Sequence, residues 1–172
     1  MPYRGHNLEI ECPNCPKKRL SSRGIYNKMR QVLDQKDYYW LGTEMLECSH
    51  CRKTFVATDS RIVSNLPFYY QVQFPAVLTS KYACDKSLIN LMKSRTLGNS
   101  SHALMNSLQE AHSEHWMKCN MEYLASCEKY IDNFSSMFGE VEFEKLPPFK
   151  DLPKSQWLLS VYVRDVWSRF DE

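Results

Sequence analysis

The sequence predicts an α+β protein in which a small zinc-ribbon-like antiparallel β unit packs against a mainly α-helical domain. Two C-x-x-C pairs lie among strand-forming residues before residue 58, and helical periodicity dominates from residue 85 onwards. With 43% hydrophobic and 24% charged residues, the composition is that of an ordinary globular chain. We therefore expect a zinc-ribbon-like domain at 1–58, a connector at 59–84 and a helical domain at 85–172.

The expected β unit consists of short strands around two turns. Leu8–Glu11 leads into the first cysteine pair, and Met29–Leu33 forms a second apolar run. Tyr38–Glu47 is rich in aromatic residues and leads into the second pair, after which Thr54–Ala57 has β-branched character. Two metal-binding turns fed by strands are typical of a zinc ribbon.

The connector begins with a capping signal, because Asp59 or Ser60 can start a short helix that ends at Asn65. An aromatic stretch, Phe68–Phe74, then lies between two prolines. Because a residue before proline disfavours the helical conformation, this stretch is predicted to be extended and packed rather than helical.

Helix 85–97 has clear apolar periodicity, and Gly98 stands where a left-handed C-terminal cap is wanted. A cap at 99–100 starts a second helix, which either continues to about Phe134 or breaks near Ser113. A helix, a short glycine-containing turn and a second helix form the outline of a helix-turn-helix.

The strongest chemical signal is the cysteine quartet Cys12, Cys15, Cys48 and Cys51, which predicts one structural Zn²⁺ ion. Each C-x-x-C turn presents two thiolates, and two turns complete a tetrahedron. The alternatives are a redox C-x-x-C, unrelated buried thiols, or His50 in place of one thiolate. A four-thiolate site leaves no position for water, so the predicted metal stabilises the fold and argues against catalysis.

The remaining histidines and cysteines are predicted to be packed rather than reactive. His112, His115 and Cys119 lie at helical spacing and could hold a second metal ion, but they share an apolar stripe. Cys84, Cys119 and Cys127 have no recognisable neighbouring base in the sequence, and buried free cysteine is common. Phosphate-loop and nucleophile-elbow motifs are absent from the sequence. We expect no enzyme and no small-molecule substrate.

The net charge of +2 is permissive for a nucleic-acid partner without announcing one. Residues 1–58 hold ten Lys and Arg against six Asp and Glu, so the positive excess lies near the cysteines. A solvated surface is the competing interpretation. The candidate phosphate contacts are Lys17, Lys18, Arg19, Arg23, Lys28, Arg30, Lys86, Lys93 and Arg95.

The compartment is predicted to be the nucleus, with the cytoplasm as the alternative. Two C-x-x-C pairs among seven cysteines suit thiolate ligation in a reducing environment. The N-terminal residues lack the apolar core of a secretory signal, and no run approaches the roughly 20 apolar residues of a membrane span. A membrane partner is therefore not expected.

Several motifs resemble a known domain. They are the cysteine quartet, Leu66-Pro67, Gln73–Thr79, Asp85–Ile89, Arg95–Ser100, His112–Trp116 and Trp157–Asp165. Together they resemble the zinc-binding domain that precedes an RNase H-like, DDE-type catalytic domain in transposase-derived vertebrate proteins, a group that includes an HMG-box-containing member. The resemblance implies a targeting or scaffolding part, with catalytic acidic residues expected only beyond a helix like 157–170.

Two functions follow as hypotheses. The first is a zinc-stabilised DNA-binding module whose affinity falls steeply with salt. The second is a protein-interaction or assembly module without nucleic-acid binding. Pro153 is predicted to open a last helix, Lys154–Phe170. In the second hypothesis its Trp157, Tyr162 and Trp167 pack against a partner, together with the tyrosines at 69–70.

Overall fold

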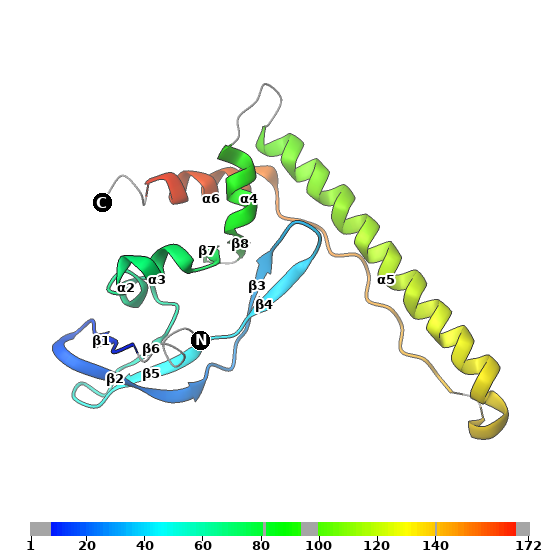
Figure 1. Ribbon diagram of the computed structural model, residues 1–172, viewed down its shortest axis with the longest axis horizontal. Helices are drawn as coiled ribbons and strands as arrows, with labels where there is room; N and C mark the ends of the chain where they lie inside the picture. The colour runs from blue at the N-terminus through cyan, green and yellow to red at the C-terminus, as the bar shows by residue number, and fades with distance from the viewer. Residues whose placement is uncertain (1–7, 81, 94–99, 140, 168–172) are drawn as a thin grey trace. The chain divides into compact units, whose positions relative to one another are not determined.

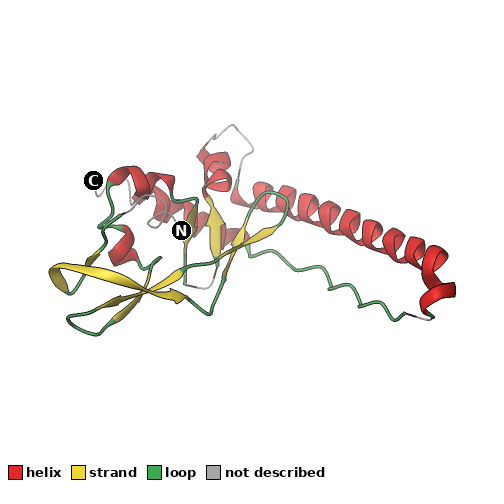
Figure 2. Ribbon diagram, turned by 60° about the horizontal axis from the view of Figure 1, so that its bottom comes forward, coloured by secondary structure: helices red, strands yellow, loops and turns green. Residues whose placement is uncertain are grey.

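The computed structural model describes residues 8–80, 82–93, 100–139 and 141–167. Contacts within the chain define two compact units. The first comprises Met1–Leu33 and Tyr38–Lys86, and the second comprises Asp34–Asp37 and Ser87–Glu172. The first unit holds the strands and two short helices, and the second holds the long helices (Figures 1 and 2). The predicted α+β class, with a small antiparallel sheet and a helical C-terminal region, is confirmed.

The first sheet is antiparallel and carries both cysteine turns. Its strand order is β1-β2-β5-β6, with β1 at Glu11–Cys12, β2 at Cys15–Ile25, β5 at Glu44–Cys48 and β6 at Thr54–Val56. In β5, burial alternates with the two-residue period of a strand: Leu46 and Cys48 are buried, whereas Met45 and Glu47 are partly exposed. This alternation turns the Cys48 side chain towards the core of the unit.

A second sheet has the order β4-β3-β8-β7, formed by β4 (Tyr38–Leu41), β3 (Arg30–Leu33), β8 (Ala83–Asp85) and β7 (Ala76–Leu78). The β3–β8 pair is parallel, and the other pairs are antiparallel. The predicted single run Tyr38–Glu47 is wrong. It forms two strands in different sheets, because the chain leaves the strand conformation at Gly42-Thr43.

Two short helices follow the first sheet. Helix α2 begins at Ser60, as its capping signal predicted, but ends at Val63 rather than Asn65. The Asp59 carboxylate accepts a hydrogen bond from the Arg61 N–H at 3.0 Å. The expected extended conformation of Phe68–Phe74 is wrong, because Phe68–Gln73 forms helix α3. Pro67 directly precedes the first turn, where proline is compatible with a helix, and Lys86 Nζ donates to the Gln71 and Val72 carbonyls at the C-terminal end.

Asp59→Ala is expected to destabilise the first unit by about 1 kcal/mol, the usual cost of losing an N-cap. The hydrogen bonds of Arg61 hold the pKa of Asp59 below its usual value. The stabilisation is therefore fully present above the unfolded pKa of about 3.9 and is lost as the pH falls through the lower folded pKa.

Urea unfolding at neutral and acidic pH measures this difference. Asp59→Asn is the control that keeps the cap and loses the charge, and an equal loss in both variants would contradict the capping role.

The second unit contains the helices α4 (Lys86–Lys93), α5 (Ser101–Phe138) and α6 (Ser155–Trp167). Each helix buries part of one face. The buried positions are Leu88, Ile89 and Met92 in α4, Met105, Leu108 and His112 in α5, and Leu158, Val161 and Asp165 in α6. Among the described helices, none combines the length and the apolar character that crossing a membrane requires.

The helical predictions need two corrections. Asp85 ends strand β8, so α4 begins one residue later than expected, at Lys86. Of the two alternatives for the second helix, the uninterrupted one is confirmed and the break near Ser113 is wrong, and the helix ends at Phe138 rather than at about Phe134. Its cap is confirmed, because Ser100 Oγ accepts a hydrogen bond from the Ala103 N–H at 3.1 Å. The expected turn at 94–99, with Gly98, lies outside the described residues.

Candidate metal centre

Each C-x-x-C pair forms a tight turn between two antiparallel strands. The first turn joins β1 to β2, and the second joins β5 to β6. In the second turn the Arg52 N–H donates to the Cys48 carbonyl at 2.9 Å, and Arg52 adopts a left-handed conformation with φ 59°. Lys17, two residues after the first pair, is also left-handed with φ 63°. These backbone conformations close both turns.

Strand pairing brings the two turns together although they are far apart in the sequence. Strands β2 and β5 are antiparallel neighbours, and Leu20 lies opposite Cys48. The start of β2 therefore lies near the end of β5, and the two cysteine turns face one another at the same end of the sheet. The long segment between Cys15 and Cys48 is accommodated because β3 and β4 form a hairpin in the other sheet.

The four sulfur atoms have the spacing of a tetrahedral metal site. All four lie within 4.8 Å of one another, and the Cys12 and Cys51 Sγ atoms are 3.8 Å apart. With metal–sulfur bonds of about 2.3 Å, a regular tetrahedron places its sulfur atoms about 3.8 Å apart. Among the described residues, Cys12, Cys15, Cys48 and Cys51 form the group of ligand-type side chains that gathers in this way. They are the residues that could hold a metal ion.

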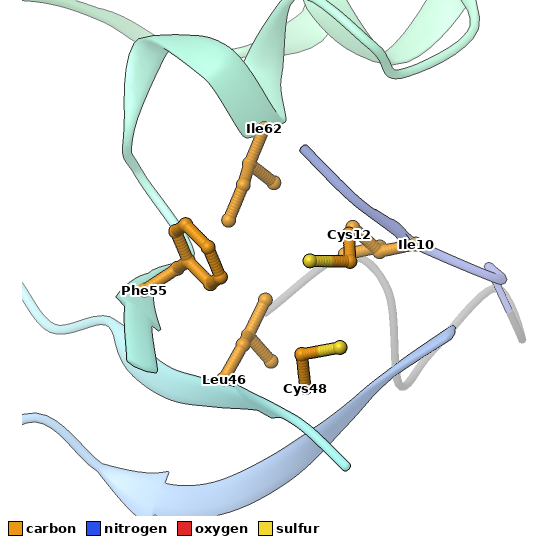
Figure 3. Packing of buried hydrophobic residues seen from close by; sticks show 6 residues of the cluster. All are labelled: Ile10, Cys12, Leu46, Cys48, Phe55 and Ile62. Carbon is orange, nitrogen blue, oxygen red and sulfur yellow. The ribbon is translucent and has the colours of Figure 1, made fainter. Parts of the chain in front are cut away.

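The cluster is embedded in the core of the first unit. Cys12 and Cys48 are 3% and 0% exposed, and they pack with Ile10, Leu46, Phe55 and Ile62. Figure 3 shows the two sulfur atoms among these apolar side chains. Cys15 and Cys51 lie at the edge of the cluster and are partly exposed. A metal bound here would join the two turns directly to the hydrophobic core.

The electrostatics of the quartet favour a cation. Hydrogen bonds from the backbone N–H groups of Cys51 and His50 lower the pKa of the Cys48 thiol to about 7. Burial raises the pKa of Cys12, and burial together with the neighbouring Cys51 raises the pKa of Cys15 to about 12. Close thiols resist ionising together because their negative charges repel. A divalent cation removes that repulsion and deprotonates its ligands.

His50 lies beside the quartet rather than within it. Its Nδ1 atom is 3.7 Å from Cys15 Sγ, and the group that gathers within 4.8 Å consists of the four cysteines. The imidazole can therefore hydrogen-bond a coordinated sulfur. Such contacts orient a ligand without replacing it.

The second candidate metal site is not assembled. His112 is buried, and its Nε2 atom lies 2.8 Å from the Asp34 carbonyl oxygen, a contact that occupies this nitrogen. His115 Nε2 is 3.6 Å from Cys119 Sγ and 3.7 Å from Asp37 Oδ2. Both contacts involve the same nitrogen of His115. In a catalytic triad, by contrast, a carboxylate binds one ring nitrogen and the other nitrogen activates the nucleophile, so these three residues do not form a triad.

The candidate phosphate contacts fall into two groups. Lys17, Lys18, Arg19, Arg23 and Lys28 are exposed on or just after β2. The others take part in contacts within the protein: Arg30 donates to the Thr79 carbonyl, Lys86 caps α3, and Lys93 pairs with Asp165 at 3.6 Å. Arg95 lies outside the described residues.

Sequence reasoning missed Arg52 and Lys53, two exposed cations directly after the second cysteine pair. The sequence pattern could have indicated them, because they follow the second C-x-x-C pair as Lys17 follows the first. It was overlooked because the first turn holds the denser run of positive charge.

The chain belongs to a family described as "Domain of unknown function (DUF6729)", which matches residues 1–167. A comparison with curated proteins and a comparison with solved structures each give no match. The family thus covers both units and includes the cysteine quartet.

Proposed function

We propose that this protein is a non-catalytic, zinc-stabilised module that binds DNA and derives from the targeting part of a transposase. Zinc is the proposed metal because four thiolates in a tetrahedron are its usual structural ligand set. The motif resemblance to transposase-derived proteins supports the proposed origin. A nuclear location follows from the proposed partner.

The observation that carries the proposal is the exposed cationic surface around the two cysteine turns. Lys17 and Lys18 lie near the start of β2, and Arg52 and Lys53 follow the second turn. The antiparallel pairing of β2 and β5 brings these two turns together at one end of the sheet. We call these four residues the turn cations. Phosphate contacts are made by such side chains and position a protein on nucleic acid.

Neighbouring charges reduce the contribution of the two arginines on β2. Arg19 forms an ion pair with Glu9 at 2.5 Å, and Arg23 forms one with Glu47 at 3.3 Å. These exposed pairs are weak, so a phosphate can compete for the guanidinium groups. The turn cations nevertheless carry the larger share of the proposed affinity.

A concave aromatic site adds a second support. A cavity of about 470 Å³ is lined by Tyr26, Lys28, Arg30 and Trp40, among others. Trp40 is 62% exposed, which is unusual for a tryptophan in a strand. An exposed indole beside cations is the combination on which unpaired bases stack. DNA with a single-stranded segment is therefore the preferred probe.

The test is binding to mixed-sequence DNA, duplex and single-stranded, across a salt series. The double variant Lys17→Glu/Lys18→Glu is expected to weaken binding at least tenfold and to flatten the salt dependence, because about two phosphate contacts are lost. Lys129→Glu/Lys145→Glu makes the same charge change at exposed lysines of the second unit and is the matched control. Equal losses in the two variants, or no binding of the unchanged protein at low salt, would contradict the proposal.

A protein-interaction module is the alternative, and exposed aromatic side chains favour it. Trp167 at the end of α6 is 65% exposed, and Tyr69 in α3 is 62% exposed. Large exposed aromatic residues are enriched at protein interfaces. If the unchanged protein fails to bind DNA, capture of a partner through α6 becomes the experiment of choice.

A further inference from the structure

From Met117 onwards, α5 carries an apolar stripe with coiled-coil spacing. Met117, Met121, Leu124 and Ile131 are separated by four, three and seven residues, and Glu128 occupies the remaining position of the same stripe. Alternating steps of four and three residues are the heptad pattern that places one helix face against another helix. We call these five residues the α5 stripe.

The α5 stripe is exposed, whereas the first turns of the same helix bury apolar residues. Met117, Met121, Leu124 and Ile131 are 51%, 71%, 58% and 49% exposed. In the first half, Met105, Leu108 and His112 are buried. Contiguous exposed apolar residues of this size mark an interaction surface.

Another face of the same helix segment is already covered by the chain that follows it. Trp116 Nε1 donates to the Pro147 carbonyl at 3.2 Å, and the Tyr123 hydroxyl donates to the Glu144 carbonyl at 2.8 Å. The ring of Trp116 meets Phe149 edge-on, with centroids 6.0 Å apart. The segment from 141 to 150 thus runs beside α5 (Figure 1), and these contacts attach it to the face that carries Trp116 and Tyr123. The remaining apolar stripe is available to another helix.

Charge decides how a second copy of α5 can pair with the first. In a parallel pair, Glu128 faces Glu128 of the other copy across a central layer, which is unfavourable. In an antiparallel pair centred near residue 126, Glu128 faces Leu124, and Met121 faces Ile131. The same register sets Lys118 beside Asp132 of the other copy, and symmetry provides this ion pair twice.

Small side chains make the centre of this arrangement accessible. Ala125 of one copy lies beside Ala125 of the other, next to the symmetry axis, so the two helices can approach closely. Lys118, Ala125 and Asp132 are all exposed in the single chain. Lys118 is also 3.9 Å from Glu122 of its own helix, an exposed contact that an intermolecular pair can replace at little cost.

We propose that the chain forms a symmetric homodimer in which the α5 stripes of two copies pair antiparallel about Ala125. A two-fold axis uses the same surface on both copies, so one stripe supplies both halves of the interface. Glu128 enters two symmetry-related layers, each opposite Leu124 of the other copy, and these polar layers specify register and orientation at some cost in affinity. The dimer does not depend on the turn cations or on DNA binding.

The first test is the molar mass of the zinc-loaded chain in solution, measured by light scattering over a concentration series. We expect a reversible monomer–dimer equilibrium, and we expect Met121→Glu/Leu124→Glu to give a monomer with unchanged helix content. Val163→Glu, at a residue of α6 that is 41% exposed, is the matched control and should remain dimeric. A monomer at every soluble concentration of the unchanged chain, or dissociation of the control as well, would overturn the proposal.

The second test addresses the antiparallel register. Lys118→Asp and Asp132→Lys should each weaken the dimer, and combining them should restore it, because the charges exchange across the symmetric pair. Ala125→Cys, made with Cys119→Ser and Cys127→Ser, should form an intermolecular disulfide under mild oxidation. Additive losses in the charge variants, or a dimer that does not crosslink at position 125, would reject this register.

Discussion

Cys48→Ser is expected to abolish stoichiometric metal binding and to unfold the first unit. Cys48 is fully buried, and backbone hydrogen bonds lower the pKa of its thiol to about 7, which favours the thiolate that a metal ion needs. Structural zinc contributes an apparent binding free energy of about 10–16 kcal/mol in small domains, which equals or exceeds the roughly 5–15 kcal/mol stability of a typical domain. Losing one of four ligands therefore removes a large part of the free energy that is expected to keep this unit folded.

Metal content per chain and far-ultraviolet circular dichroism measure the two effects on one sample. Cys84→Ser is the control, because Cys84 is also 0% exposed but lies outside the quartet. The control should keep one metal ion and lose only modest stability. One full equivalent of zinc in Cys48→Ser would show that the quartet is not the ligand set.

The metal site could be predicted because its signal is local. Two cysteines separated by two residues in a turn can bind the same ion wherever that turn lies in the fold. Each C-x-x-C pair therefore predicts half of a metal site from four consecutive residues. The joining of the halves is not local. It depends on the pairing of β2 with β5, and β2 was not predicted as a strand.

Strand β2 was missed because its side chains do not alternate between apolar and polar. Nine of its eleven residues are exposed, among them Lys17, Lys18 and Arg19. Its strand conformation comes from hydrogen bonding to β1 on one side and β5 on the other, which pairs residues far apart in sequence. Exposed strands of this kind carry little periodicity for a sequence to reveal.

Helix α3 shows the opposite failure, in which contacts override local preference. Aromatic and β-branched residues such as Phe68, Tyr69 and Val72 have modest helix propensity, and the stretch lies between two prolines. Gln71 Nε2 donates to the Ser64 and Leu66 carbonyls, and Lys86 Nζ caps the C-terminal end. These contacts fix the six-residue helix that propensity alone leaves open.

The candidate DNA contacts show why residue type alone overestimates a binding surface. Lys86 and Lys93 were chosen because they lie on a helix expected to belong to a helix-turn-helix. In the structure, one caps α3 and the other pairs with Asp165, a carboxylate that is 6% exposed. A buried carboxylate needs a cation, so Lys93 contributes to the helical unit. The sequence gives no sign of this pairing because the two residues are 72 positions apart.

Leu158→Ala and Leu159→Ala are expected to differ sharply although they change the same residue type at adjacent positions of α6. Leu158 is 0% exposed and lies on the face that also buries Val161 and Asp165, whereas Leu159 is 43% exposed. Truncating a buried leucine costs about 2–5 kcal/mol, because transfer free energy is lost and a cavity remains. At Leu159 the loss should stay within about 1 kcal/mol, as for most surface substitutions.

Chemical unfolding of both variants, followed by circular dichroism at 222 nm, measures the difference, because the helices of the second unit dominate that signal. The metal content of both variants should remain at the level of the unchanged protein, since the quartet belongs to the first unit. Equal destabilisation at the two positions would mean that α6 does not present the Leu158 face to the core. Loss of metal from Leu158→Ala alone would instead mean that the two units unfold as one, which makes the helical unit part of what holds the metal site closed.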